Sequence, residues 1–402
     1  MNVSGLKCVA CGKRYAEGEV MYTCPACGIE GILDIEYDYD RIKWQPSDER
    51  SIWRYLPLLP IRGDKGLPTL QVGWTPVASF PNLAKQVGVR ELLIKDDGRM
   101  PTGSFKDRSS AVGTVKAREL GFDIVACSST GNAASSLAGF CANQQLRAIL
   151  FVPMHAPEAK VAQLRAFGAR VLLVEGSYDQ AYYLCQDAVR EFGWYNRNCA
   201  VNPYLVEGKK TCGLEIGEQL GKDPPDWVAV AVGDGCTVAG IWKGMKEMHR
   251  LGVLARLPRL LGVQAAGAAP LVDAFDKKRE DGITRVKADT CADSIAVGEP
   301  RNWRKALRAV RESGGAFISV SDDAILDASR EIAASSGIFA EPTGAAALAG
   351  IRAAKQHIGK NDRVLHIVTG NGLKDVKGAA RKAPEPVRIG VSLEDVRRVW
   401  QG

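Results

Sequence analysis

The sequence lacks any long apolar run. No stretch of about 18 consecutive apolar residues, the minimum for a membrane-spanning helix, occurs among its 402 residues. The N-terminus also lacks the apolar segment of a secretory signal peptide. A dense block of lysine and arginine is absent too, because the 53 basic and 46 acidic residues that give the net charge of +7 are dispersed. We therefore expect a cytoplasmic protein with neither a membrane nor a nucleic-acid partner.

Histidine is scarce. The sequence holds four histidines, none paired at the spacing i, i+4, and it has no G-x-S-x-G motif, so a serine hydrolase is disfavoured. Acid–base chemistry then depends on another group, and a lysine whose pKa is lowered by its surroundings is the main candidate.

What the chain does contain is an ordinary globular composition. Apolar residues make up 46% and charged residues 25% of it, without low-complexity tracts or repeats of fixed period. A chain of this length suits two lobes and a small appendage.

Four of the eleven cysteines gather near the N-terminus. Cys8, Cys11, Cys24 and Cys27 follow the pattern C-x2-C-x12-C-x2-C. Two such pairs can close a tetrahedral zinc site without an open position, so we predict a small structural zinc ribbon over residues 1–40. The alternative is a pair of redox motifs or disulfides, but no βαβ pattern surrounds either pair. The segment is too short for a core of its own, so the metal would supply its folding free energy.

From about residue 90, short β-branched runs alternate with helical patterns. "RAILFVP" precedes "PEAKVAQLRAFG", and "WVAVAVG" precedes "TVAGIWKGMKEMHRLG". This alternation predicts an α/β fold with a doubly wound parallel sheet. Ligands of such folds bind beyond the carboxyl ends of the strands, so the turns after the strands are where chemistry is expected.

Several of these turns are rich in small polar residues. "SSTGN" opens a helix and places Thr130 and Asn132 where free backbone N–H groups favour an anion. "VTGNG" presents the hydroxyl of Thr369 after the last strand. "VGDGCT" can wrap a phosphate with main-chain donors, although a plain connecting turn between a strand and a helix is an equal alternative. Its residues are Gly233, Asp234, Gly235, Cys236 and Thr237.

The segment "PTGSFKDR" places Lys106 behind a turn that includes Ser104. Together with the turns above and with "VNPYLVEGKKT" and "SGIFAEPTGAAALAG", it resembles the fold type II family of pyridoxal-5′-phosphate (PLP) enzymes, and within it the threonine synthases. The resemblance covers roughly residues 70–380, with the motifs in the expected order. It implies two lobes, each with a parallel-rich sheet flanked by helices, in addition to the N-terminal zinc ribbon.

The resemblance also implies roles for individual residues. Lys106 would carry PLP as a Schiff base and act as the base, Asn132 would bond the phenolic oxygen of the cofactor, and Thr369 would meet its ring nitrogen. The cofactor phosphate would lie in the turn formed by Gly233, Asp234, Gly235, Cys236 and Thr237.

For the substrate, the resemblance implies that Asn202 faces it. We predict that Arg170 assists Asn202 in binding a phosphate, because a guanidinium fork suits phosphate oxygens; a solvated turn is the alternative for Arg170. Ser104 and Thr130 are predicted to bind the substrate carboxylate, because they neighbour Lys106 and Asn132 in their motifs.

The implied reaction converts O-phospho-L-homoserine and water to L-threonine and phosphate. Two departures from the family pattern concern the substrate: Asp234 brings a carboxylate to the phosphate turn, and Leu205 stands where the family often has arginine. A serine/threonine ammonia-lyase, or a β-replacement enzyme for O-phosphoserine, is therefore an alternative. A catalytically silent zinc-ribbon protein is disfavoured by the presence of Lys106, Asn132 and Thr369.

Three further expectations concern organisation. Residues 41–97 and 207–402 would form a large PLP-binding lobe, and 98–206 a small mobile lobe. We expect a homodimer, the common default for soluble enzymes, with a small amino-acid substrate.

Overall fold

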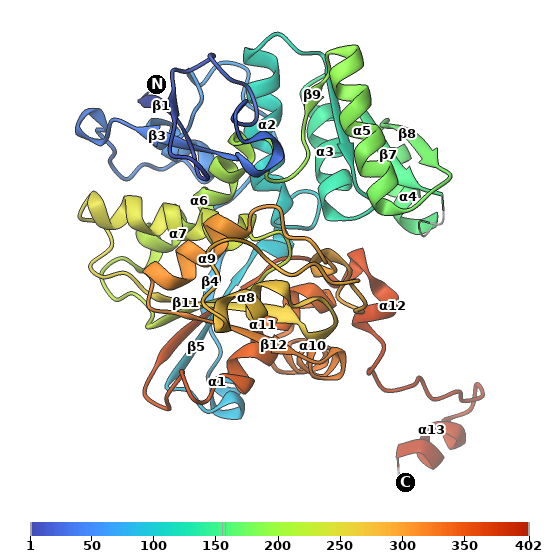
Figure 1. Ribbon diagram of the computed structural model, residues 1–402. Coiled ribbons are helices and arrows are strands. Elements are labelled where there is room, and N and C mark those ends of the chain that lie inside the picture. The colour runs from blue at the N-terminus through green and yellow to red at the C-terminus, as the bar shows by residue number, and fades with distance from the viewer. Residues whose placement is uncertain (1, 155, 157, 401–402) are drawn as a thin grey trace.

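Two parallel-rich sheets and a small antiparallel sheet organise the chain (Figure 1). The computed structural model describes residues 2–154, 156 and 158–400. The larger sheet has the strand order β12-β11-β10-β13-β5-β4, and all its pairings are parallel except that of β4 with β5. Its strands are β4 (Val77–Ser79), β5 (Glu91–Asp96), β10 (Trp227–Ala231), β11 (Arg259–Ala265), β12 (Ala316–Val320) and β13 (Arg363–Val368).

Helices cover both faces of the larger sheet. The β-branched and apolar residues of its strands alternate in direction: Val228 and Val230 of β10 join the core of one face, and Ala229 and Ala231 join that of the other. The first face is covered by α6 (Tyr204–Leu220), α7 (Cys236–Arg250), α8 (Pro270–Asp276) and α9 (Trp303–Glu312). The second is covered by α1 (Pro81–Val87), α10 (Asp322–Ser336) and α11 (Pro342–Ala353).

The smaller sheet is parallel throughout and has the order β8-β7-β6-β9. Its strands are β6 (Ile124–Ser128), β7 (Arg147–Pro153), β8 (Arg170–Val174) and β9 (Tyr195–Asn196). Its helices are α2 (Lys106–Glu119), α3 (Asn132–Asn143), α4 (Glu158–Ala166) and α5 (Tyr178–Phe192). Leu137 of α3 and Leu164 of α4 pack on one face, and Val189 of α5 packs on the other. The predicted α/β class, with parallel-rich sheets flanked by helices, is confirmed.

The strands of the smaller sheet lie within the predicted small lobe, 98–206, and those of the larger sheet lie outside it. Helix α6 crosses the predicted boundary and packs against both α2 and α7. The boundaries themselves stay a prediction.

The N-terminal sheet, with the order β2-β1-β3, lies beside α7 and α9 (Figure 1). It is formed by β1 (Val3–Cys8), β2 (Arg14–Tyr15) and β3 (Leu33–Tyr37). Tyr37 Oη donates to Glu207 at 2.7 Å, and Lys305 Nζ donates to the Leu33 carbonyl at 2.7 Å. These bonds tie β3 to the larger sheet's helical layer.

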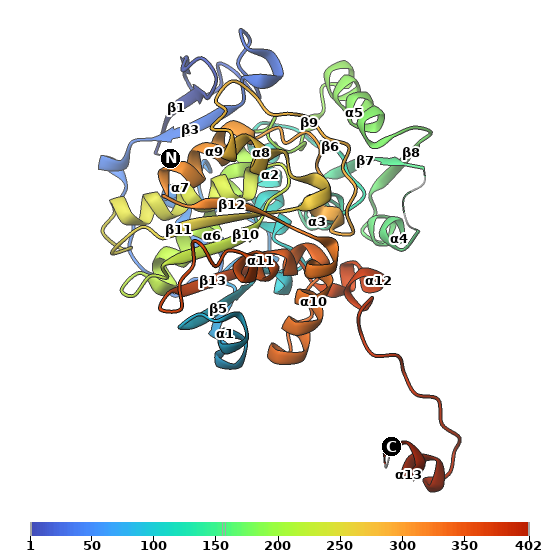
Figure 2. The ribbon, with the colours of Figure 1, turned by 60° about the horizontal axis from the view of Figure 1, so that its bottom comes forward.

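The C-terminal segment leaves the body after α12 (Val376–Ala379) and ends in α13 (Leu393–Trp400), as Figure 1 and Figure 2 show. Among the helices of the described residues, none is long and apolar enough to cross a bilayer.

Candidate active site

The loop before Lys106 lies against the end of β13. Phe105 N donates to the Thr369 carbonyl at 2.9 Å, and Asn371 N donates to the Gly103 carbonyl at 3.0 Å. Ser104 and Gly370 form an isolated antiparallel bridge. Two segments that are far apart in the chain thus place Lys106 and Thr369 at one site.

Lys106 begins α2 and is half-buried. Within the described residues, no hydrogen bond or ion pair joins its Nζ to a partner. Burial lowers its pKa, and the nearby charge of Lys209 lowers it further. A lysine in this state can exist as a neutral amine, which is the form that acts as a nucleophile or a base.

Two hydroxyls beside Lys106 are buried without a partner among the described residues. Thr369 Oγ1 and Ser104 Oγ make no hydrogen bond, and their side chains are 8% and 0% exposed. A buried hydroxyl without a partner is costly, so a missing bonding group is expected there. A heteroaromatic ring with a nitrogen, and a ligand with a carboxylate, would both supply such groups.

The turn after β10 has the form of a phosphate cradle. Gly235 caps α7 with φ = 87°, and a Cβ on it would lie 2.6 Å from the Ala306 Cβ. The first turn of α7 has no side-chain cap, so its N–H groups point outward as donors for an anion. Asn302, whose carbonyl borders Gly235, is fully buried with both amide atoms unpartnered among the described residues. The residues present therefore fit a bound phosphate.

Asp234, the carboxylate in this turn, is oriented toward the segment at 301–302. Its Oδ1 accepts from Arg301 N at 3.3 Å and lies 3.9 Å from Arg301 Nη1. Its carbonyl accepts from Asn302 N at 3.0 Å. Burial raises the pKa of Asp234, and both its bonds and this shift reduce its repulsion of an anion in the turn.

Asn132, at the start of α3, reaches across to the larger sheet. Its Nδ2 donates to the two carboxylate oxygens of Glu341 at 2.9 and 3.1 Å and to Ser294 Oγ at 3.1 Å. Glu341 precedes α11 and is 4% exposed, and burial raises its pKa to about 7. Sequence reasoning missed Glu341 because the segment "AEPTGAAALAG" indicated a helix start and a packed face, and nothing local showed that the carboxylate lies near Lys106.

A cavity lies beside these residues. Its walls include Thr130, Asn132, Lys160, Glu341 and Lys374. Lys160 pairs with Asp293 at 2.5 Å, whereas Lys374 donates to Ser135 at 2.7 Å and Gln163 at 2.6 Å. The two lysines face the carboxylates of Asp293, Glu341 and Asp375 in the same lining, and neither lysine was singled out from the sequence.

The structure does not bring Arg170 or the side chain of Asn202 to this cavity. Arg170 is exposed and begins β8, so it lies at the amino edge of the smaller sheet, opposite the carboxyl ends. Asn202 is fully buried; its Nδ2 donates to the Asn196 carbonyl at 2.8 Å, and its Oδ1 accepts from Tyr204 N at 3.0 Å. Asn202 thus holds the start of α6, and neither residue is part of the site proposed below.

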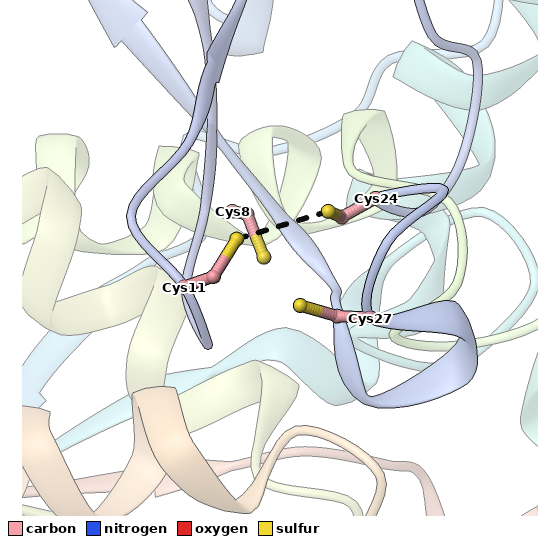
Figure 3. Close-up of side chains that lie close together, drawn as sticks. All are labelled: Cys8, Cys11, Cys24 and Cys27. Atoms are coloured by element: carbon pink, nitrogen blue, oxygen red, sulfur yellow. Dashed lines mark hydrogen bonds between the residues drawn. The ribbon is translucent and has the colours of Figure 1, made fainter.

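The four N-terminal cysteines face one centre (Figure 3). The sulfur atoms of Cys8, Cys11, Cys24 and Cys27 all lie within 4.8 Å of one another, and Cys11 Sγ is 3.8 Å from Cys24 Sγ. A tetrahedron with zinc–sulfur bonds of about 2.3 Å has edges of roughly 3.8 Å, so the donor set fits zinc. None of the eleven cysteines, all of them in the described part of the chain, forms a disulfide.

This arrangement is that of a PLP-binding α/β enzyme of fold type II, and comparison with known proteins agrees. The model of the "Pyridoxal-phosphate dependent enzyme" family matches residues 68–370. The chain therefore belongs to this family.

Within the family, the chain is similar to threonine synthases over its whole length. It is 39% identical to the threonine synthase of Methanocaldococcus jannaschii, with 98% of each chain covered. It is 38% identical to that of Methanosarcina acetivorans, with 99% of this chain and 98% of the other covered. The identity with the Synechocystis sp. enzyme is 36%, covering 86% of this chain and 90% of the relative.

Solved structures show the same fold. The processed form of threonine deaminase isoform 2 from Solanum lycopersicum matches with a TM-score of 0.62 and 22% identity, covering 81% of this chain and 82% of that one. Diaminopropionate ammonia lyase from Escherichia coli matches with a TM-score of 0.66 and 19% identity, covering 86% and 94%. The predicted family and fold type are thus confirmed.

Proposed function

We propose that the chain is a threonine synthase, which converts O-phospho-L-homoserine and water to L-threonine and phosphate. The observation that carries this proposal is the contact between the segment of Lys106 and the end of β13, where the Lys106 amine and the Thr369 hydroxyl both lack a partner among the described residues. The similarity to threonine synthases over 98% of the chain supports this choice of substrate within the PLP family.

The cofactor would be held by four groups. Lys106 binds it covalently, the start of α7 with Gly233, Gly235, Cys236 and Thr237 receives its phosphate, Thr369 meets the ring nitrogen, and Asn132 meets the phenolic oxygen. When bound, PLP supplies the electron sink for the carbon acid. The unpartnered hydroxyl of Thr369 and the uncapped first turn of α7 support these assignments.

Lys106 serves as the proton-transfer group in this proposal. Its lowered pKa favours the neutral form of the Nζ amine, the form that can accept the α-proton of the substrate and return a proton later. Thr369, a neutral hydroxyl, holds the ring nitrogen without a formal charge. That favours elimination and replacement at the β- and γ-carbons over transamination.

The remaining residues position an anionic amino acid. Ser104 and Thr130 would bind its carboxylate, since the Ser104 hydroxyl is buried without a partner among the described residues and Thr130 lines the cavity. Lys160 and Lys374 supply ammonium groups in the cavity wall that could pair with the anionic groups of the substrate.

One assay separates this reaction from its nearest alternative. Purified enzyme is given O-phosphohomoserine in one reaction and threonine in another, and phosphate and 2-oxobutyrate are measured. Phosphate release with formation of threonine is expected. Faster formation of 2-oxobutyrate from threonine would instead make the chain an ammonia-lyase. In a third reaction with O-phosphoserine, release of phosphate from that substrate alone would make it a β-replacement enzyme.

The proposal includes three properties of the protein as a whole. The four N-terminal cysteines would bind one structural Zn²⁺, which metal analysis of the purified protein measures directly. We also propose a homodimer in the cytoplasm; light scattering that returns the mass of one chain would contradict the dimer.

A further inference from the structure

Two consecutive lysines on α6 are both buried, but only one of them is neutralised. Lys210 pairs with Glu207 at 2.6 Å and with Glu247 at 3.0 Å. Lys209 is 1% exposed, and its Nζ donates to Cys199 Sγ at 3.2 Å. Among the described residues, no carboxylate lies within ion-pair distance of Lys209. A buried ammonium that is paired with no carboxylate is costly, so a bound anion would stabilise it further than Cys199 alone does.

A second buried cation lies in the same region. Arg197 is 1% exposed; its Nη2 donates to Ser110 Oγ at 3.2 Å, and its Nε has no partner among the described residues. Ser110 is one helical turn beyond Lys106 on α2. The guanidinium of Arg197 therefore lies beside the helix that begins with Lys106, and it keeps an N–H free to donate.

The contacts place Lys209 near both Lys106 and α7, and Arg197 near Lys106. A Cβ on Gly240, which is one turn inside α7, would lie 2.8 Å from the Lys209 Cβ. The charges of Lys209 and Arg197 both reach Lys106, where they oppose protonation of its amine. Lys209 also follows Leu205 by one turn, so it occupies the same face of α6 as the position where the sequence departs from the family's arginine.

We propose that Lys209 and Arg197 form a phosphate-binding subsite next to Lys106, which holds a phosphate monoester at the junction of α2, α6 and α7. The inference rests on the proposed function for the presence of phosphate esters in the site. These have two sources, the cofactor and the substrate. Lys209 supplies a positive charge on α6, one turn after Leu205, which stands where the family often has arginine.

Cys199 fits this inference as the group that accompanies Lys209 in the absence of phosphate. The hydrogen bond with Cys236 and the charges of Lys209 and Arg197 lower the pKa of Cys199. A phosphate that takes over Lys209 and Arg197 would remove part of this stabilisation. The Cys199 thiol should then react more slowly with an alkylating agent at neutral pH.

The test uses Lys209→Gln and Arg197→Gln in the full chain, with Lys209→Arg as the charge-conserving variant. Lys222→Gln, which changes an exposed lysine just beyond the end of α6, is the control. Circular dichroism first establishes that each variant is folded. The first arm compares the equilibrium affinities for PLP and for pyridoxal, which lacks the phosphate. The second arm titrates inorganic phosphate into the holoenzyme by calorimetry.

The two arms distinguish the source of the phosphate. If the cofactor's phosphate fills the subsite, Lys209→Gln weakens PLP binding by about tenfold and leaves pyridoxal binding unchanged. If the substrate's phosphate fills it, PLP binding is unchanged and the holoenzyme binds inorganic phosphate about tenfold more weakly. Lys209→Arg should retain most of the affinity, and Lys222→Gln all of it.

A third measurement detects phosphate at the subsite through the reactivity of Cys199, without a binding titration. Mass spectrometry of the Cys199 peptide follows its alkylation by iodoacetamide, with and without inorganic phosphate, and phosphate should protect Cys199 in the wild type but not in Lys209→Gln. Unchanged PLP and phosphate affinities in both glutamine variants would overturn the subsite. Because no arm measures turnover, a different substrate for the enzyme would leave this test valid.

Discussion

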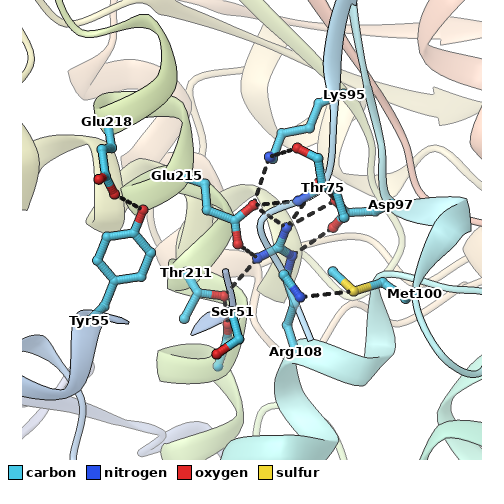
Figure 4. A network of polar contacts seen from close by, with 12 residues as sticks. Ser51, Tyr55, Thr75, Lys95, Asp97, Met100, Arg108, Thr211, Glu215 and Glu218 are labelled. Carbon is cyan, nitrogen blue, oxygen red and sulfur yellow. Dashed lines mark hydrogen bonds and ion pairs between the residues drawn. The ribbon is translucent and has the colours of Figure 1, made fainter. Parts of the chain in front are cut away.

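Two polar regions begin two positions apart on α2. They differ in whether their charged groups are paired with opposite charges. Arg108 lies in a network in which each charge meets an opposite charge (Figure 4). Lys106, at the start of the same helix, has no such partner among the described residues. The paired charges around Arg108 stabilise the fold, whereas the polar groups around Lys106 that have no partner among the described residues can bind a ligand.

The network around Arg108 is balanced. Arg108 binds Asp97 at 2.7 Å and Glu215 at 2.5 Å, and Lys95 binds Glu215 at 2.7 Å. Thr75 adds a bond from its hydroxyl to Asp97 at 2.6 Å. Two cations and two carboxylates, all with side chains 0% exposed, thus join β5, α2 and α6.

The region around Lys106 is unbalanced in two ways. Its hydroxyls on Ser104 and Thr369 lack partners among the described residues, and neither Lys209 nor Arg197 forms an ion pair with a carboxylate in that part of the chain. The surrounding fold holds such a region in its folded form. Binding of an anionic ligand there would stabilise the folded protein further. The balanced network on the same helix is the part of the fold that can hold Lys106 in place.

The largest effect is expected from Lys106→Ala. It should lower kcat by about 10³-fold or more, because it removes the proton-transfer group. The unfolding midpoint of the cofactor-free protein should stay the same or rise, since the variant removes a half-buried amine that has no partner among the described residues. Steady-state kinetics and thermal unfolding measure both. Retained turnover, or a visible absorbance band of bound cofactor like that of the wild type, would remove Lys106 from its proposed role.

Arg108→Met tests the other side of the comparison. It leaves two buried carboxylates opposite one lysine, and the free energy of unfolding should fall by about 3–5 kcal/mol. Denaturant titration measures this change. The double variant Arg108→Met/Glu215→Gln leaves one cation and one anion, so it should recover part of the loss. A double variant that is as unstable as the sum of the two single variants would contradict a balanced network.

The two regions also differ in how far the sequence predicts them. "SSTGN" and "TGNGLKD" each follow an apolar run, so their place at strand ends was predictable from periodicity, whereas the role of "PTGSFKDR" came from the resemblance to a family. The network was not predictable, because the partners of Arg108 come from the turn after β5 and from α6, and only the three-dimensional fold brings Asp97 and Glu215 together. Glu341 and Lys209 were missed for the same reason.

The position of Arg170 follows from its neighbours in the sequence. It precedes the apolar run "VLLV", so it had to begin its strand and lie at the amino edge of the sheet. Asn202 precedes a proline, and a short polar side chain there commonly bonds the local backbone. Its bonds to Asn196 and Tyr204 are of this kind. Both cases follow from local rules, whereas the charge balance of a site depends on distant segments.

Glu341, in the region around Lys106, should make the stability of the protein depend on pH. Its pKa is raised from 4.5 to about 7 in the folded protein, because it is buried. The unfolded chain therefore ionises first as pH rises, and the stability that this group contributes at low pH is lost between those two values. Relative to Glu341→Gln, the wild type should lose up to about 3 kcal/mol over this range. Denaturant midpoints of the cofactor-free protein at several pH values measure it, and parallel pH profiles of the two proteins would contradict the shift.

The smallest effect is expected where the N-terminal ribbon meets the site. Ile32, next to β3, packs in one cluster with Val206 of α6 and Cys236 at the start of α7. Removal of the metal by a chelator, or Cys24→Ser, should unfold the ribbon, because its segment has little core of its own. The start of α7 would lose this packing but keep its other contacts, so we expect PLP affinity to fall only by about 1 kcal/mol.

Equilibrium PLP titration of the native and chelator-treated protein measures this change. Ile32→Ala, which keeps the four cysteines, should reproduce part of it without loss of metal, and Ile29→Ala, at an exposed position of the same loop, should not. If chelation abolished PLP binding altogether, the ribbon would be part of the cofactor site itself. If chelation and Ile32→Ala both left the PLP affinity unchanged, the contact between Ile32 and Cys236 would have no effect on the site. The regions around Arg108 and Lys106 would then be held by the two lobes without the ribbon.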